Sequence, residues 1–208
     1  MRILAIASIL GACSVSYALG PAVQSWTGGT RFASFFTSAQ ATPDMVGFQF
    51  SVNTNVDVSQ FGIWNDNDAN GLDQTHRVLL WRLSDQALLS DVTVTPGDTL
   101  ISGFRYATGA NVSLVTGTTY VIAADYWSGG LDGYISTPTS AVYDSAMTHI
   151  GAAAPAVVNS GYVMPTALVT TNRGRFGPNM IFTDPVPEPA TMVALGLGAA
   201  ALLRRRRK

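Results

Sequence analysis

Cysteine and lysine are almost missing from this chain. The single cysteine, Cys13, lies in an apolar run near the amino terminus, so a protein cut after that run would hold no thiol and no disulfide. Between Leu19 and Pro187 there is no lysine, and six arginines stand against twelve aspartates, a net charge of about −6. This balance excludes a nucleic-acid interface, which needs clustered positive charge to displace counterions.

Bases that titrate near neutral pH are equally scarce, since His76 and His149 are the only histidines. A catalytic triad needs a nucleophile, a base and an acid that converge, and no serine has the context of a nucleophile elbow. The aspartates mostly stand beside turn residues rather than as a catalytic pair. We therefore predict no enzymatic activity, with a hydrolase as the least favoured alternative, and expect His76 to begin a strand and hydrogen-bond to the backbone.

Helical periodicity is also missing. At 208 residues the chain suits one domain, and from Trp26 to Thr183 apolar residues alternate instead, as in Val46, Phe48 and Phe50. We predict an all-β fold, a single antiparallel, jelly-roll-like β-sandwich over residues 19–183. Its expected strands cover residues 46–52, 56–58, 61–64, 78–83, 88–95, 100–106, 112–115, 119–127, 162–170 and 180–183.

Glycine-containing turns separate these strands. They include Asn70-Gly71, Thr108-Gly109 and Thr116-Gly117, which tolerate positive φ or preset a bend. The least regular segment runs from Ala141 to Pro155, and we expect it to be a loop.

The amino terminus has the pattern of a signal peptide over residues 1–18. Met1 and Arg2 supply a small positive region, residues 3–15 an apolar run, and Ser16-Tyr17-Ala18 small residues around a cleavage site. We predict export with cleavage after Ala18. An alternative is lipidation of Cys13, because residues 10–13 read as a lipobox.

The carboxyl-terminal residues 184–208 have the pattern of a second targeting signal, which consists of three parts. A short motif, Val186, Pro187, Glu188 and Pro189, precedes fourteen uncharged residues from Ala190 to Leu203. A basic cluster follows: Arg204, Arg205, Arg206, Arg207 and Lys208. The apolar part predicts a transmembrane helix, and the cations would stay on the cytoplasmic side as a membrane stop. At about 1.5 Å per residue the helix spans roughly 21 Å, short of the roughly 30 Å hydrocarbon core, which favours transient anchoring.

This tail resembles the PEP-CTERM sorting signals of Gram-negative bacteria, in which a Pro-Glu-Pro motif, a transmembrane stretch and an arginine cluster follow one another. The resemblance implies that an exosortase, a membrane-embedded transpeptidase, recognises Pro187, Glu188 and Pro189. The protein would be held briefly in the inner membrane and then delivered to the cell surface or extracellular matrix.

A second, weaker resemblance concerns the domain itself. Residues 46–52, 77–81, 103–106 and 117–123 are similar, in this order, to an uncharacterised β-sandwich domain of bacterial surface proteins. The similarity covers about Met45 to Tyr134 and implies a fold but no reaction. A structural or adhesive role is therefore the expectation.

An aspartate-rich segment suggests a metal site. Residues 66–71, Asp-Asn-Asp-Ala-Asn-Gly, reproduce the first half of a calcium loop, but Arg77 stands where a bidentate glutamate should close the shell. A non-standard calcium site remains open; its ligands would be Asp66, Asp68, Asn70 and Asp73. The alternative is a plain Asn-Gly turn between strands.

Aromatic rings supply the last candidate site. Trp127 and Tyr134 are the best placed to stack on a sugar, whereas Trp81 lies in an apolar strand and is expected in the core. A carbohydrate-binding module for exopolysaccharide, helped by calcium, is thus the alternative to a structural protein.

Overall fold

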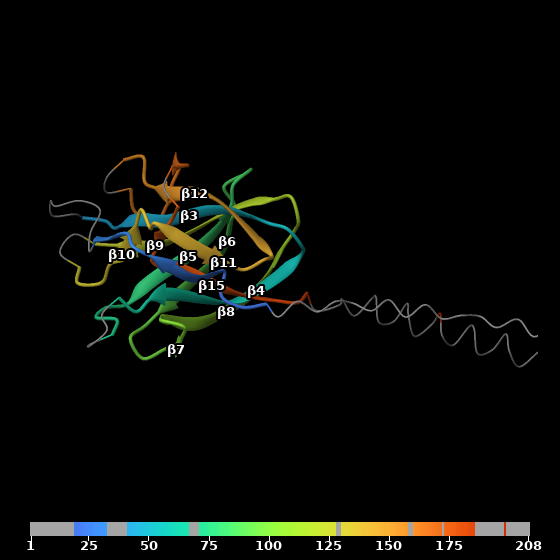
Figure 1. Cartoon of the computed structure of the whole chain (residues 1–208), viewed down its shortest axis with the longest axis horizontal. Helices are drawn as coiled ribbons and strands as arrows, with labels where there is room; N and C mark the ends of the chain where they lie inside the picture. Colours follow the sequence, from blue (N-terminus) through green and yellow to red (C-terminus); the bar gives the residue numbers. More distant parts are fainter. Residues whose placement is uncertain are drawn as a thin grey trace, which may run out of the picture.

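Antiparallel strands dominate the molecule, which confirms the predicted all-β class (Figure 1). The computed structural model describes residues 19–32, 41–66, 71–127, 130–157, 160–171 and 173–185, together with Gly198. These residues form fifteen strands arranged in sheets of six, four, three and two strands.

The six-stranded sheet has the order β13-β12-β3-β9-β5-β6. Its central strands have apolar side chains on both faces. In β5, for example, Val78 and Leu80 lie in the main core, whereas Leu79 and Trp81 lie in a second, smaller cluster. Trp81 is 4% exposed, which confirms the expected core position. The strand bounds are β13 Ala167–Val169, β12 Met147–Ala154, β3 Asp44–Val52, β9 Thr119–Tyr126, β5 His76–Arg82 and β6 Leu88–Val94.

The four-stranded sheet has the order β15-β4-β8-β7 and lies against the main core from the other side. Phe61 and Ile63 of β4 and Met180 of β15 are fully buried in the same cluster as the inward side chains of β3, β9 and β5. In Figure 1, β12 and β3 lie above this core, and β8 and β7 lie below it. The strand bounds are β15 Pro178–Thr183, β4 Val56–Trp64, β8 Phe104–Leu114 and β7 Thr99–Ile101.

Two small sheets complete the described chain. β1 (Val23–Thr27) pairs with β11 (Ser140–Tyr143), and β10 (Tyr134–Ser136) lies between β14 (Arg175–Phe176) and β2 (Thr30–Phe32). Trp26 of β1 packs its ring against Trp64, Phe104 and Phe176, with centroids 5.4 to 5.8 Å apart. These ring contacts join the two small sheets to each other and to the four-stranded sheet.

The prediction of a loop from Ala141 to Pro155 was wrong, because β11 and β12 occupy most of this segment. β12 pairs with β3 and β13, a position inside the six-stranded sheet. Its small residues fit there: a Cβ added to Gly151 would lie 3.0 Å from the carbonyl oxygen of Val169, and Ala152 and Ala153 are fully buried. Close packing, not large side chains, makes this segment a strand.

Three smaller expectations also need correction. The Thr108-Gly109 turn does not form, because β8 runs through it, and a Cβ on Gly109 would meet Val92 at 2.5 Å. The strand expected over residues 100–106 is split between β7 and β8 by a turn with positive φ at Ser102 and Gly103. Of the strand expected over residues 162–170, only β13 is formed.

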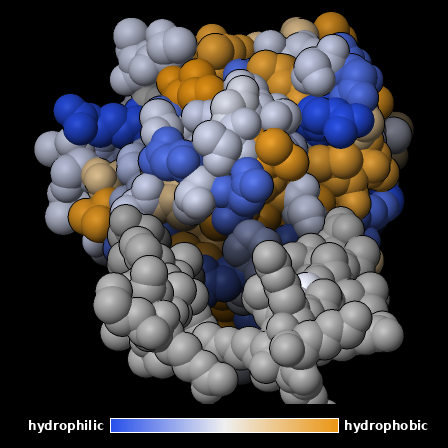
Figure 2. Space-filling view, turned by 90° about the vertical axis from the view of Figure 1, so that its right-hand side faces the viewer, coloured by the Kyte–Doolittle hydropathy of each residue, from blue (hydrophilic) through white to orange (hydrophobic). Residues whose placement is uncertain are grey.

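The first and last described segments of the domain lie side by side. Pro21 forms a bridge with Ile181, and the Phe182 amide donates to the Gly20 carbonyl. β15 runs from Pro178, opposite Ile63, to Thr183, opposite Asp57, so it leads the chain out at one end of the domain. Figure 2 shows this end, where hydrophobic and hydrophilic residues of the described chain are interspersed.

Candidate functional site

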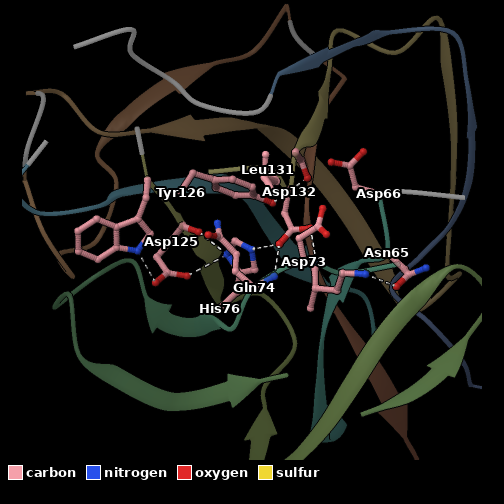
Figure 3. Close-up of polar contacts among 12 residues, drawn as sticks. Asn65, Asp66, Asp73, Gln74, His76, Asp125, Tyr126, Leu131 and Asp132 are labelled. Carbon is pink, nitrogen blue, oxygen red and sulfur yellow. Dashed lines mark hydrogen bonds and ion pairs between the residues drawn. The ribbon is translucent and has the colours of Figure 1, made fainter. Parts of the chain in front are cut away.

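Charged side chains gather around His76 (Figure 3). Asp66, beside this cluster, follows the end of β4 that pairs with Pro178, so the cluster lies at the end of the domain opposite to Thr183. His76 begins β5, Asp125 lies near the end of β9, and Asp132 belongs to the segment that connects β9 to β10. All three are buried, with exposed fractions of 0%, 3% and 1%. We call these three residues the His76 network.

Both ring nitrogens of His76 are engaged. Nδ1 lies 2.7 Å from the backbone oxygen of Asp125 and 3.2 Å from its carboxylate, and Nε2 lies 3.1 Å from the carboxylate of Asp132. This agrees with the expectation that His76 begins a strand and bonds to the backbone. The two carboxylate contacts were not foreseen.

The surroundings favour the doubly protonated, positively charged ring. Burial acts to lower the pKa of His76, but the hydrogen bonds to Asp125 and Asp132 outweigh it and raise the pKa to about 9. Burial likewise acts to raise the pKa of Asp132, and the hydrogen bonds from His76 and from two backbone amides lower it instead. His76 and Asp132 are therefore both ionised at neutral pH.

Asp132 also holds the segment that leads into β5. Its two carboxylate oxygens accept from the backbone amides of Asp73 and Gln74, both at 2.8 Å. Asp125 accepts from the Arg77 amide at 2.8 Å, and longer contacts of 3.4 and 3.3 Å join it to the Trp127 indole and the Tyr162 hydroxyl. The network thus fixes backbone from several segments at once.

A second ion pair lies beside the network. Arg31 donates from two nitrogens to the two carboxylate oxygens of Asp66 and also donates to the Leu131 carbonyl. Gly133 permits this approach, because a Cβ there would lie 2.8 Å from both an Asp66 oxygen and the Phe32 carbonyl. Bidentate pairing of this kind fixes the direction of both side chains.

These contacts bear on the residues of the predicted calcium site. The Asp66 carboxylate is bound by Arg31, whereas the Asp73 side chain is exposed. Asp68 and Asn70 lie outside the described residues. Within the described ranges no group of three histidine, cysteine or acidic side chains is arranged to hold a metal ion. The calcium site stays a prediction.

The two predicted sugar-binding rings differ in exposure. Tyr134 is 2% exposed, and its ring packs against Tyr126 and Phe32 with centroids 4.9 and 5.9 Å apart. Its face is therefore covered in this conformation. Trp127 is partly exposed at the end of β9 and keeps a surface that a ligand could reach.

The sorting tail is the other predicted site. Its motif, Val186 to Pro189, and its basic cluster, Arg204 to Lys208, lie outside the described residues, as does the predicted signal peptide. Asp184 and Pro185 follow β15 and lead toward the motif. No helix in the described part of the chain is long and apolar enough to cross a membrane.

Comparison with known protein families directly supports the prediction of a sorting signal in the tail. The PEP-CTERM protein-sorting motif matches residues 185–208, which include every residue of the predicted motif, apolar segment and basic cluster. No curated protein matches the chain. The resemblance noted in the sequence is thus confirmed: the chain carries a PEP-CTERM sorting motif. Such a motif marks a protein that is exported, processed by an exosortase and sorted through the membrane toward the cell surface.

Proposed function

We propose that this chain is a non-enzymatic surface protein: a β-sandwich domain, residues 19–183, with a structural or adhesive role at the cell surface or in the extracellular matrix. The observation that carries the proposal is the PEP-CTERM match over residues 185–208. The signal peptide over residues 1–18 would start export, and the tail, residues 184–208, would complete sorting.

The three parts of the tail would have separate roles. Pro187, Glu188 and Pro189 would be recognised by the exosortase, residues 190–203 would stop in the inner membrane, and the basic cluster at 204–208 would hold that orientation. A transient stop fits a segment of roughly 21 Å, because it is shorter than the hydrocarbon core. The domain would be released or transferred after cleavage.

The direction of β15 supports an outward orientation of the charged end. The chain leaves the domain beyond Thr183, at the end opposite to the His76 network. While the tail is in the membrane, the loops that carry Trp127 and Leu131 would therefore point away from it. Leu131 is 66% exposed, so this end offers apolar surface beside charge to a partner.

The environments of the two histidines support a role without catalysis. His76 is fully buried with both nitrogens engaged, and burial lowers the pKa of His149 to about 4. A general base must reach the proton that it removes, with a pKa near the working pH. Neither histidine meets both conditions in this structure.

Intact-mass measurement of protein recovered from cells and from medium tests the proposal. The expected mass corresponds to a chain that begins at Leu19 and ends near Pro187. A Glu188→Ala variant should accumulate in the inner membrane with its tail uncut, while the matched Asp184→Ala variant should be processed normally. Wild-type protein that keeps residues 204–208, or equal processing of both variants, would contradict the proposal.

A carbohydrate-binding module for exopolysaccharide is the second candidate. It is favoured by the partly exposed Trp127 at the end that would point outward. Calcium held by Asp66, Asp68, Asn70 and Asp73 could order the adjacent loop. A glycan array with and without chelator tests both ideas: binding lost in chelator supports a calcium-assisted module, and no binding in either condition removes it.

A further inference from the structure

A pocket on another face of the domain has the composition of a ligand site. It has a volume of about 430 Å³ and lies between β11, β12 and the segment that follows β13. Tyr143, Thr148, His149, Thr170 and Arg173 are among the residues that line it. The volume is in the range of small-molecule sites. None of these residues was singled out as a binding residue from the sequence.

Two stacked rings form part of the wall. Tyr143 and His149 lie almost parallel, with an interplanar angle of 5° and centroids 5.0 Å apart. Behind them, Phe176 packs edge-on against both rings. The Tyr143 hydroxyl donates to the backbone oxygen of Arg173, which ties the segment bearing that arginine to the rings. The wall is thus preorganised by packing and by one hydrogen bond.

One buried polar atom of the pocket residues has no partner. Nε2 of His149 is buried and makes no hydrogen bond within the described chain. Because Nε2 itself is covered, a ligand in the pocket would contact the exposed part of the His149 ring and not this atom. Burial also keeps the ring neutral at pH 7, since it lowers the pKa of His149 to about 4.

The charge of the pocket is positive in a domain that is mostly negative. Arg173 is an exposed cation, and no acidic residue is among the described residues that line the pocket. The hydroxyls of Thr148 and Thr170 add further polar groups. A guanidinium binds a carboxylate through two parallel hydrogen bonds. The groups present therefore match a ring that carries hydroxyls and one carboxylate.

We propose that this pocket binds a uronate unit of an acidic polysaccharide. The carboxylate would lie against Arg173, the sugar hydroxyls against Thr148 and Thr170, and an apolar face of the sugar against the rings. This inference rests on the carbohydrate-binding candidate, names its ligand class and moves the contact from Trp127 to the pocket. Neutral sugars would lack the carboxylate that Arg173 would bind.

The chain offers its own reporters for a test by NMR. It has two histidines, and only His149 lines the pocket, whereas His76 is enclosed in its network. Titration of the full-length chain in detergent with trigalacturonate should shift the ring resonances of His149 in a saturable way and leave those of His76 unchanged. Methyl-esterified trigalacturonate keeps the rings and removes the charge, so its binding should be at least about tenfold weaker.

Two matched variants locate the contact. Arg173→Gln should weaken trigalacturonate binding at least about tenfold. Arg82→Gln removes a partly exposed arginine, the last residue of β5, which pairs with Asp85 and does not line the pocket; it should leave the affinity unchanged. Because neither position is buried, both variants should fold, which the dispersion of the same spectra verifies.

Three outcomes would overturn the proposal: no saturable shift of the His149 resonances, equal affinity for acid and ester, or equal affinity of the two arginine variants. None of them would affect the sorting proposal, which depends on the mature mass and on the Glu188→Ala variant. Binding that Trp127→Ala abolishes and Arg173→Gln does not would keep the carbohydrate-binding candidate and move the ligand back to the charged end.

Discussion

The charged end of the domain and the junction of its first and last strands are stabilised by different chemistry. At the charged end, an ionised histidine is enclosed by Asp125 and Asp132. At the junction, Asn179 accepts from the Val23 amide at 3.0 Å and donates to the Val23 carbonyl at 2.9 Å. Both contacts join residues far apart in the sequence and are fully or almost fully buried. The difference between them is that only the first can titrate.

Both regions connect segments that are distant in the sequence, as disulfides do in many exported domains. Residues 19–185 contain no cysteine, so long-range connections must come from packing and hydrogen bonds. A buried ion pair is sensitive to the loss of one partner, because the other charge is then left buried alone. A neutral amide loses only its hydrogen bonds. The two regions should therefore respond differently to substitution and to pH.

The largest expected effect is that of Asp132→Ala. It removes the carboxylate that faces His76 and the acceptor of two backbone amides, and breaking a buried pair in this way costs about 3–5 kcal/mol. Urea unfolding at pH 7 measures the free energy of unfolding. Asp91→Ala is the control: it breaks the surface pair with Arg77, and such pairs contribute about 0–1 kcal/mol. Equal losses in both variants would refute the role of the network.

The next effect is a loss of stability in mildly alkaline solution. The folded pKa of His76, about 9, is above its ordinary value of 6.5, so its contribution is complete below pH 6.5 and is lost as pH rises through 9. Linkage gives a fall of up to about 3 kcal/mol over that range. Unfolding curves from pH 6.5 to about 9.5 measure it. Burial raises the pKa of Tyr134 and Tyr143 to about 12, so these tyrosines stay neutral in the folded state there.

A His76→Gln variant separates this effect from other groups. It should be less stable than the wild type at pH 6.5, and its stability should change little between pH 6.5 and 9.5. A slope that persists in the variant would assign the alkaline effect to another residue.

The smallest of the three effects is that of Asn179→Ala at the junction. The variant leaves the Val23 amide and carbonyl without their partner in a buried position, and we expect a loss of about 2–3 kcal/mol. In contrast to the network, this loss should be the same at pH 6.5 and pH 9. Asn55→Ala, which removes an exposed side chain that accepts from the Thr116 amide, should cost much less. A strongly pH-dependent loss in Asn179→Ala would remove the distinction between the two regions.

Large alternating side chains made much of the fold predictable. The pattern of Val46, Phe48 and Phe50 identified β3, because this strand buries these large residues on one face. The strand predicted over residues 119–127 corresponds to β9, which buries apolar residues on both faces. β12 was missed because its buried half is glycine and alanine. Small residues give a weak signal along the chain and become informative only when the neighbouring strand that they approach is known.

The contacts of the charged end were less predictable for a different reason. His76 was placed correctly at the start of a strand, but it is 49 residues from Asp125 and 56 from Asp132. Arg31 and Asp66 are likewise 35 residues apart. Such pairs depend on the order of strands in the sheets, which local patterns do not determine. The sorting motif was predictable because its three parts follow one another directly in the sequence.

The direction of β15 also has a mechanical consequence. A pull on the chain beyond Thr183, resisted by a partner bound at the charged end, would act along the axis of β15. Its hydrogen bonds to β4, spread from Pro178 to Thr183, would then be loaded together in shear rather than opened one after another. The same strand that leads the chain toward its sorting motif would thus be the element that bears tension.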